Sequence, residues 1–176
     1  YKIAGEMLPC VIHVAARTIA THALSIFGDH SDVMGVRQTG FAMAASSSVQ
    51  EAQDMALASH LATNLSKIPF VHFFDGFRTS HEVNTITPIA DEVVKALAEG
   101  YGNIWERPCE FTPSNPIQKG TNQGEDIFFQ NREAINKYID AVPAAFERVL
   151  KDIHKATGRK YGLFEYYGAK DATHVM

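Results

Sequence analysis

Residues 69–82 read Pro-Phe-Val-His-Phe-Phe-Asp-Gly-Phe-Arg-Thr-Ser-His-Glu, and this stretch decides the expected fold. Its first six residues form a short run that is apolar and rich in aromatic side chains, which is typical of a buried strand. The mostly polar residues from Asp75 to Glu82 then follow directly. The stretch therefore predicts a strand with a polar loop at its carboxyl end.

Two further strand candidates and a capped helix precede this stretch. Residues 9–16 and 41–45 are short apolar runs, and runs without alternation are typical of parallel strands covered on both faces. Ser48, with Glu51 three positions later, matches a capping box for a helix that runs to about Ser66. A strand, helix and strand in this order predict an α/β fold with a doubly wound, mainly parallel sheet and flanking helices. Ligands of such sheets bind at the carboxyl ends of the strands.

The second half of the chain predicts more helix and little sheet. Residues 91–99 and 131–157 are expected to be helical, with Pro143 marking a break or kink in the longer one. Residues 103–124 are expected to form an irregular surface loop, because prolines and glycines interrupt them. Residues 161–168 are aromatic and predict either a closing strand or a segment packed against a partner domain.

The composition is that of an ordinary globular protein. The 176 residues are 45% hydrophobic and 20% charged, with a formal net charge of -4, which excludes a disordered tail. No apolar run approaches about 18 residues, so no membrane-spanning helix is expected. The mild acidity argues against a nucleic-acid partner. Cys10 and Cys109 are the only cysteines, too few for an iron–sulfur cluster or a Cys-rich metal site.

The amino-terminal residues indicate part of a longer polypeptide. The chain opens at Tyr1 without an initiator Met and without the charged start of a signal peptide. We therefore expect residues 1–176 to be a single α/β domain segment of a larger multidomain protein.

Arg17 is the strongest candidate for a functional residue. It directly follows the strand candidate at residues 9–16, which places it at the edge of the sheet where ligands bind. Its planar guanidinium can hold a carboxylate or a phosphate with two parallel hydrogen bonds. The alternative is a structural arginine that pairs with an acidic neighbour.

Other polar groups have plainer interpretations. Asp29, His30 and Asp32 could be a metal or acid–base cluster, but Asp and Ser readily close turns through backbone hydrogen bonds, so a hydrogen-bonded turn is favoured. His13 and His72 lie within apolar strands and are interpreted as core histidines whose hydrogen bonds are satisfied.

The polar loop at residues 75–82 carries a dense charged group. Asp75 and Arg78 could pair across the turn, and together with His81 and Glu82 they are expected to shape a pocket or an interdomain seam. The aromatic residues of this loop predict an ordered, packed segment. The sequence contains no glycine-rich phosphate loop after a strand, no G-x-S-x-G, no H-E-x-x-H and no C-x-x-C.

Long blocks of the chain resemble the pyruvate:ferredoxin (flavodoxin) oxidoreductase family. Two of them are His-Val-Ala-Ala-Arg at 13–17 and Phe-Phe-Asp-Gly-Phe-Arg-Thr-Ser-His-Glu at 73–82. The other blocks are residues 1–9, 23–33, 37–43, 120–121 with 123, 126–130, 132–134 and 157–164. The resemblance covers nearly the whole chain and is weakest from Thr87 to Lys119.

The resemblance implies a position within the enzyme. The chain is similar to the carboxyl-terminal part of the family's first domain, the pyrimidine-side half of a thiamine-diphosphate site, here incomplete. The complete enzyme, usually a homodimer, decarboxylates pyruvate on thiamine diphosphate with Mg²⁺ and passes the acetyl group to coenzyme A. Its electrons leave through 4Fe-4S clusters to ferredoxin or flavodoxin. By resemblance, Arg17 binds the substrate carboxylate, and no cofactor is bound wholly by this segment, which alone would be inactive.

Two alternatives remain open at this stage. A relative acting on another 2-oxo acid would also need a carboxylate-binding arginine, and a non-catalytic interaction domain could share the fold. The family's oxygen-sensitive clusters imply a reducing compartment, the cytoplasm or a hydrogenosome-type organelle. The remaining domains of the same polypeptide are the expected partners.

Overall fold

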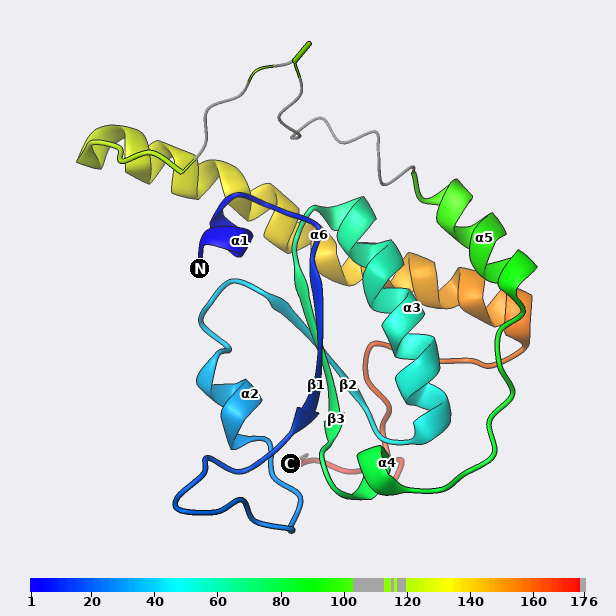
Figure 1. Ribbon diagram of the computed structural model, residues 1–176. Helices are drawn as coiled ribbons and strands as arrows, with labels where there is room; N and C mark the ends of the chain where they lie inside the picture. Colours follow the sequence, from blue (N-terminus) through cyan, green and yellow to red (C-terminus); the bar gives the residue numbers. More distant parts are fainter. Residues whose placement is uncertain (103–112, 115, 117–119, 175–176) are drawn as a thin grey trace.

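The computed structural model describes residues 1–102, 113–114, 116 and 120–174. The loop expected at 103–124 lies mostly outside these residues. The described part contains a central sheet with helices on both of its faces (Figure 1). The α/β class expected from the sequence is therefore confirmed.

The sheet has three parallel strands, β1 (Val11–Ala16), β2 (Ala42–Ser46) and β3 (Phe70–Asp75), in the order β1-β3-β2. The strand predicted most clearly from the sequence thus lies in the middle. All three strands end at the same edge, which brings the residues after Ala16, Ser46 and Asp75 together.

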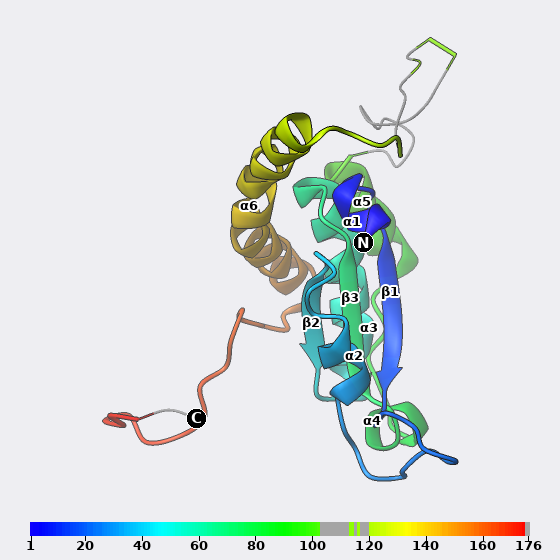
Figure 2. The same cartoon turned by 90° about the vertical axis from the view of Figure 1, so that its left-hand side faces the viewer.

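Helices flank the sheet on both sides. The helices are α1 (Lys2–Gly5), α2 (Ser31–Gly35), α3 (Val49–Ser66), α4 (Arg78–His81), α5 (Asp91–Gly100) and α6 (Glu125–Thr157). The short α2 lies on one side of the sheet and α3 on the other, and α6 packs across α3 (Figures 1 and 2). This two-sided cover is the doubly wound arrangement expected from the sequence.

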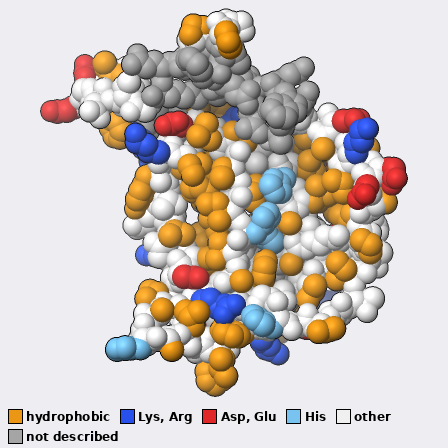
Figure 3. Space-filling view, in the orientation of Figure 1, with side chains coloured by type: hydrophobic (Ala, Val, Ile, Leu, Met, Phe, Trp, Pro, Cys, Tyr) orange, Lys and Arg blue, Asp and Glu red, His pale blue; other side chains and the backbone are white. Residues whose placement is uncertain are grey.

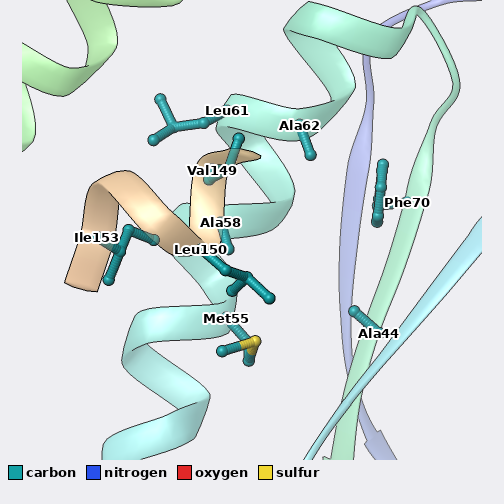
Figure 4. Packing of buried hydrophobic residues seen from close by; sticks show 9 residues of the cluster. All are labelled: Ala44, Met55, Ala58, Leu61, Ala62, Phe70, Val149, Leu150 and Ile153. Atoms are coloured by element: carbon teal, nitrogen blue, oxygen red, sulfur yellow. The ribbon is translucent and has the colours of Figure 1, made fainter. Parts of the chain in front are cut away.

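The larger core lies between the sheet, α3 and α6. Its fully buried members come from these three layers and meet side by side (Figure 4): Ala44, Met55, Ala58, Leu61, Ala62, Phe70, Val149, Leu150 and Ile153. A smaller cluster of Ala16, Val33, Val71 and Phe73 lies under α2 on the opposite face. Burial of a large apolar side chain stabilises the fold by about 1.5–3 kcal/mol.

The capping box before α3 is present, with one difference. The Ser48 hydroxyl accepts a hydrogen bond from the Glu51 backbone N–H at 3.1 Å, as expected for an N-cap. The Glu51 carboxylate instead accepts bonds from the backbone and hydroxyl of Ser47, both at 2.7 Å. The serine half of the box is formed, and the helix begins where the sequence predicts it.

Several expectations need correction. Helix α6 begins at Glu125, six residues before the expected start, and continues through Pro143 without a break. Residues 161–168 do not form the closing strand that was one of two expectations for them, and packing against a partner domain stays a prediction. Strand β1 is at the sheet edge, with Ile12 43% exposed, so it is not covered on both faces as the apolar run suggested.

Candidate functional site

A cavity of about 670 Å³ opens at the carboxyl ends of β2 and β3. Its walls come from the strand ends, the start of α3, α4 and the segment after α6. They include Ala45, Ser46, Ser47, Glu51, Met55, Asp75, Arg78, Thr79, Glu82, Tyr161, Gly162, Leu163, Glu165 and His30. The cavity therefore lies where α/β sheets bind their ligands.

Arg17 lies at the same carboxyl end of the sheet, directly after β1, but does not line this cavity. Its guanidinium carbon lies 3.9 Å from the ring centroid of Phe77, a stacked cation–π contact. Its buried Nε has no hydrogen-bond partner among the described residues. The backbone N–H of Arg17 donates to Asp32 Oδ2 at 2.9 Å, which ties the end of β1 to α2. Asp32 thus positions the backbone and leaves the side chain available for a ligand.

Gly76 makes the position of Arg17 possible. A Cβ on this residue would lie 2.1 Å from Arg17 Nε and 2.2 Å from the Ala16 carbonyl oxygen. Because a backbone carbonyl cannot move away as a side chain can, only glycine fits here. The glycine of the Asp-Gly-Phe-Arg sequence is therefore part of the Arg17 site.

Asp75 organises the turn after β3. Its Oδ1 accepts hydrogen bonds from the backbone N–H groups of Phe77 at 2.8 Å and Arg78 at 2.6 Å. These bonds, that from Arg78 foremost, lower the pKa of the Asp75 carboxyl. Arg78 thus contacts Asp75 through its backbone N–H. Residues 78–81 form α4, so this ordered segment is helical and was wrongly expected to be a loop.

The group at Asp29, His30 and Asp32 is a hydrogen-bonded turn. Asp29 Oδ1 accepts bonds from the backbone and hydroxyl of Ser31, at 2.7 and 2.5 Å, and these bonds lower the pKa of the carboxyl. The favoured interpretation is therefore confirmed. His30 stacks edge-on against Phe73, with ring centroids 5.3 Å apart, and lines the cavity.

A buried carboxylate clamp, formed by Asp54, Arg159 and Tyr161, holds the segment after α6 against the cavity. Asp54 is fully buried on α3, and its two oxygens accept bonds from Arg159 Nε at 2.6 Å and Nη2 at 2.9 Å. The Tyr161 hydroxyl donates a third bond at 2.6 Å. Burial, and next the bond to Asp54, raise the pKa of Tyr161 above its usual range. Sequence reasoning missed the clamp, because nothing local relates residues more than a hundred positions apart.

A histidine chain, formed by Ser46, His72, His13 and His60, crosses the sheet on its α3 side. Ser46 Oγ lies 2.6 Å from His72 Nε2, His72 Nδ1 lies 2.9 Å from His13 Nδ1, and His13 Nε2 lies 3.2 Å from His60 Nε2. His13 and His72 are directly opposite in the strand register. His72 is buried and hydrogen-bonded, as expected, whereas His13 is exposed, which corrects its assignment to the core.

The charges of the cavity do not fit a diphosphate group. Four carboxylates line the cavity, those of Glu51, Asp75, Glu82 and Glu165. The basic side chains in its lining are the Arg78 guanidinium and the His30 imidazole. Among the described residues, no group of three or more His, Cys, Asp or Glu side chains is arranged to hold a metal ion. The lining of this cavity is therefore more acidic than basic, which does not favour a diphosphate at this position.

Comparison with known proteins identifies the family. Residues 1–151 match the family described as "Pyruvate flavodoxin/ferredoxin oxidoreductase, thiamine diP-bdg". The chain belongs to this family. It is 55% identical to a pyruvate:ferredoxin oxidoreductase of Moorella thermoacetica and 53% identical to a probable pyruvate-flavodoxin oxidoreductase of Escherichia coli, each over all 176 residues. It is also 52% identical over 178 aligned positions to a mitochondrial pyruvate dehydrogenase [NADP(+)] of Euglena gracilis.

The chain corresponds to a small part of these larger proteins. It spans 15% of the length of the first two relatives and 10% of the third. The family relationship confirms the resemblance seen in the sequence blocks. Among the described residues, no helix is both long enough and apolar enough to cross a membrane.

Proposed function

We propose that the full-length protein oxidises pyruvate with coenzyme A to acetyl-CoA and CO₂. The observation that carries this proposal is the identity of 50–55% over the entire chain to enzymes named for pyruvate and ferredoxin or flavodoxin. The proposed holoenzyme is a homodimer that contains thiamine diphosphate with Mg²⁺ and 4Fe-4S clusters, works in the cytoplasm or a hydrogenosome-type organelle, and passes electrons to ferredoxin or flavodoxin. Residues 1–176 would be one α/β domain segment of that holoenzyme.

Arg17 is the proposed binding residue for the pyruvate carboxylate. Three observations support this role: its position after β1, its stacking on Phe77 and its buried Nε without a partner among the described residues. A guanidinium fixed in this way is already oriented before the substrate arrives. Two parallel bonds to the carboxylate would hold the substrate in one pose.

The cofactor chemistry belongs to the rest of the protein. Thiamine diphosphate, when bound, supplies the carbon that attacks the pyruvate carbonyl. The residues described here would bind and orient the substrate beside it.

Arg17→Ala in the full-length enzyme tests this role. Removal of one partner of a charged, hydrogen-bonded pair costs on the order of 2–5 kcal/mol. At about 1.4 kcal/mol per decade, kcat/KM for pyruvate should fall roughly thirtyfold to several thousandfold. Arg17→Lys should restore only part of the loss, because it keeps the charge and loses the planar fork.

The matched control is Arg37→Ala. Arg37 is exposed and donates only to the Met34 carbonyl among the described residues, so this variant should retain wild-type kcat/KM. Melting temperatures are measured on the same preparations. An Arg17→Ala enzyme with normal kcat/KM would remove Arg17 from the site.

The relative from Euglena favours a second candidate acceptor. Its printed name specifies NADP⁺, so an electron-transfer partner other than ferredoxin or flavodoxin is a second proposal for this protein. Pyruvate-dependent reduction of ferredoxin, flavodoxin and NADP⁺ by the full-length protein distinguishes them. Failure of all three reactions with pyruvate would contradict the proposed function itself.

A further inference from the structure

The histidine chain joins two different environments. At one end, Ser46 lines the cavity at the carboxyl ends of the strands. At the other end, His13 and His60 are exposed, and histidine side chains reach the surface near the middle of one face, beside α3 (Figure 3). Between them, His72 is only 1% exposed. The histidine chain therefore connects the cavity to the outer surface through an unbroken series of polar side chains.

The sheet register and α3 together create this connection. Opposed residues of neighbouring parallel strands point to the same face, so the pairing of His13 with His72 puts both rings on the side covered by α3. His60 is on α3, and its ring centroid lies 5.3 Å from that of His13. Strands β1 and β3 and helix α3 thus each supply one imidazole.

The number of N–H and O–H protons in the histidine chain restricts the directions that its hydrogen bonds can take. A neutral imidazole has one N–H donor and one acceptor nitrogen. The contacts Ser46–His72, His72–His13 and His13–His60 can all be hydrogen bonds in only two ways. In one, every group donates toward the surface. In the other, every group donates toward the cavity. One arrangement converts into the other when each proton moves across its own hydrogen bond.

The surroundings of His72 and His60 within the histidine chain favour neutral imidazole rings. Burial, and next the charges that His13 and His60 would carry, lower the pKa of His72 to about 4. Burial and His13 also lower the pKa of His60. The other ring packed against His72 is that of Phe74, 5.8 Å away between centroids, and it carries no charge. These two lowered pKa values favour the neutral, hydrogen-bonded arrangements of the histidine chain.

A shared metal ion does not explain the cluster. His13 presents Nδ1 to His72 and Nε2 to His60, on opposite sides of its ring. A single ion contacts one nitrogen of each ligand, so it could not replace both contacts. A bridging imidazole that uses both nitrogens instead has the geometry of a proton shuttle.

We propose that Ser46, His72, His13 and His60 form a proton path between the cavity and the outer surface. A group in the cavity gives a proton to Ser46 Oγ while the Ser46 proton passes to His72 Nε2. The proton on His72 Nδ1 passes to His13 Nδ1, that on His13 Nε2 passes to His60 Nε2, and that on His60 Nδ1 leaves to water. One proton enters, one leaves, and every group remains neutral.

The use of this path in catalysis rests on the proposed function. Oxidation of pyruvate with coenzyme A and two one-electron acceptors produces acetyl-CoA, CO₂, two reduced acceptors and one proton. The path would carry that proton out of the protein. Ser46 is the group that faces the cavity, and the three histidines act through it.

His13→Gln in the full-length enzyme tests the path. Glutamine retains a donor and an acceptor but does not take up one proton while it releases another. At low buffer concentration, kcat should fall by about a hundredfold or more, within the range that proton transfer contributes, with KM for pyruvate unchanged. Added imidazole should restore the rate. The control is His154→Gln, because His154 is exposed on α6 and outside the chain.

The outcomes separate the path from the proposed function. Equal kcat values for His13→Gln and His154→Gln, or a loss that imidazole does not restore, would overturn the path. If the wild-type protein does not oxidise pyruvate, the proposed function fails, and neutron diffraction of full-length crystals then decides the path. The proton path is supported if one deuteron lies within each of the contacts Ser46–His72, His72–His13 and His13–His60. It is overturned if two facing nitrogens of the histidines are both unprotonated.

Discussion

The carboxylate clamp and the histidine chain are two polar clusters that share α3 and reach the same cavity. The clamp carries formal charges, and its protons are fixed because a guanidinium remains protonated in proteins. In the histidine chain, the lowered pKa values of His72 and His60 favour uncharged rings, and in the proposed path each proton has two possible positions. The comparison shows that hydrogen-bond networks of similar length can serve opposite purposes, one holding a segment in place and the other allowing protons to move.

The two clusters also differ in what they connect. The clamp joins α3 to Arg159 and Tyr161 of the segment after α6, so it closes one wall of the cavity. The histidine chain joins residues within the sheet and α3, whose positions are already set by the strand register. Loss of the clamp should therefore release a segment, whereas loss of a histidine should leave the backbone in place.

The largest expected effect is that of Asp54→Ala. Truncation of one member of a buried ion pair costs about 3–5 kcal/mol, because Arg159 and Tyr161 lose their acceptor. Hydrogen exchange in the full-length protein should lose protection at the Arg159 amide, which donates to Thr157 Oγ1, by about a hundredfold or more, at about 1.4 kcal/mol per decade. Glu147→Ala, which removes only an exposed pair with Lys151, is the control. Unchanged exchange in Asp54→Ala would mean that other contacts hold the segment.

The histidine chain should make the fold sensitive to acid. The pKa of His72 is lowered from 6.5 to about 4, so below about pH 6.5 the unfolded chain binds more protons than the folded one. The free energy of unfolding should then fall by at most about 3 kcal/mol between pH 6.5 and 4 and level off below. Hydrogen exchange of β3, corrected for intrinsic rates, measures this fall. His72→Gln should flatten it, and an equally steep fall in that variant would assign the sensitivity to other groups.

The smallest expected effect concerns the clamp at alkaline pH. Because the pKa of Tyr161 is raised, the unfolded chain loses its phenolic proton above about pH 10 while the folded chain retains it, and stability falls. Tyr161→Phe should cost about 1 kcal/mol at neutral pH and reduce the alkaline fall. Part of the fall should remain, since burial and Asp152 raise the pKa of Tyr101 to about 12. A thermal unfolding series from pH 7 to 11 compares the two proteins.

Local signals in the sequence predicted the central sheet well. The apolar runs before Ala16, Ser46 and Asp75 each form a strand, and Ser48 begins α3. The short helices α1, α2 and α4 have four or five residues each. Such segments are too short for a hydrophobic period to appear, so the sequence did not indicate them.

Long-range contacts account for what the sequence did not predict. Asp54 is a charged residue within a helix whose other buried positions are apolar or small, and its partners Arg159 and Tyr161 follow over a hundred residues later. His13 and His72 were recognised as strand residues, but their contact depends on the register of two strands that are 59 residues apart. Register is a property of the assembled sheet, and no local pattern specifies it.

The close packing of Gly76 against Arg17 has a consequence for sequence change in this protein. Any side chain at position 76 would overlap both Arg17 Nε and the backbone of Ala16, so a substitution there removes the arginine from its place as surely as a substitution at position 17. Any variant meant to keep Arg17 in its present position must therefore retain Gly76.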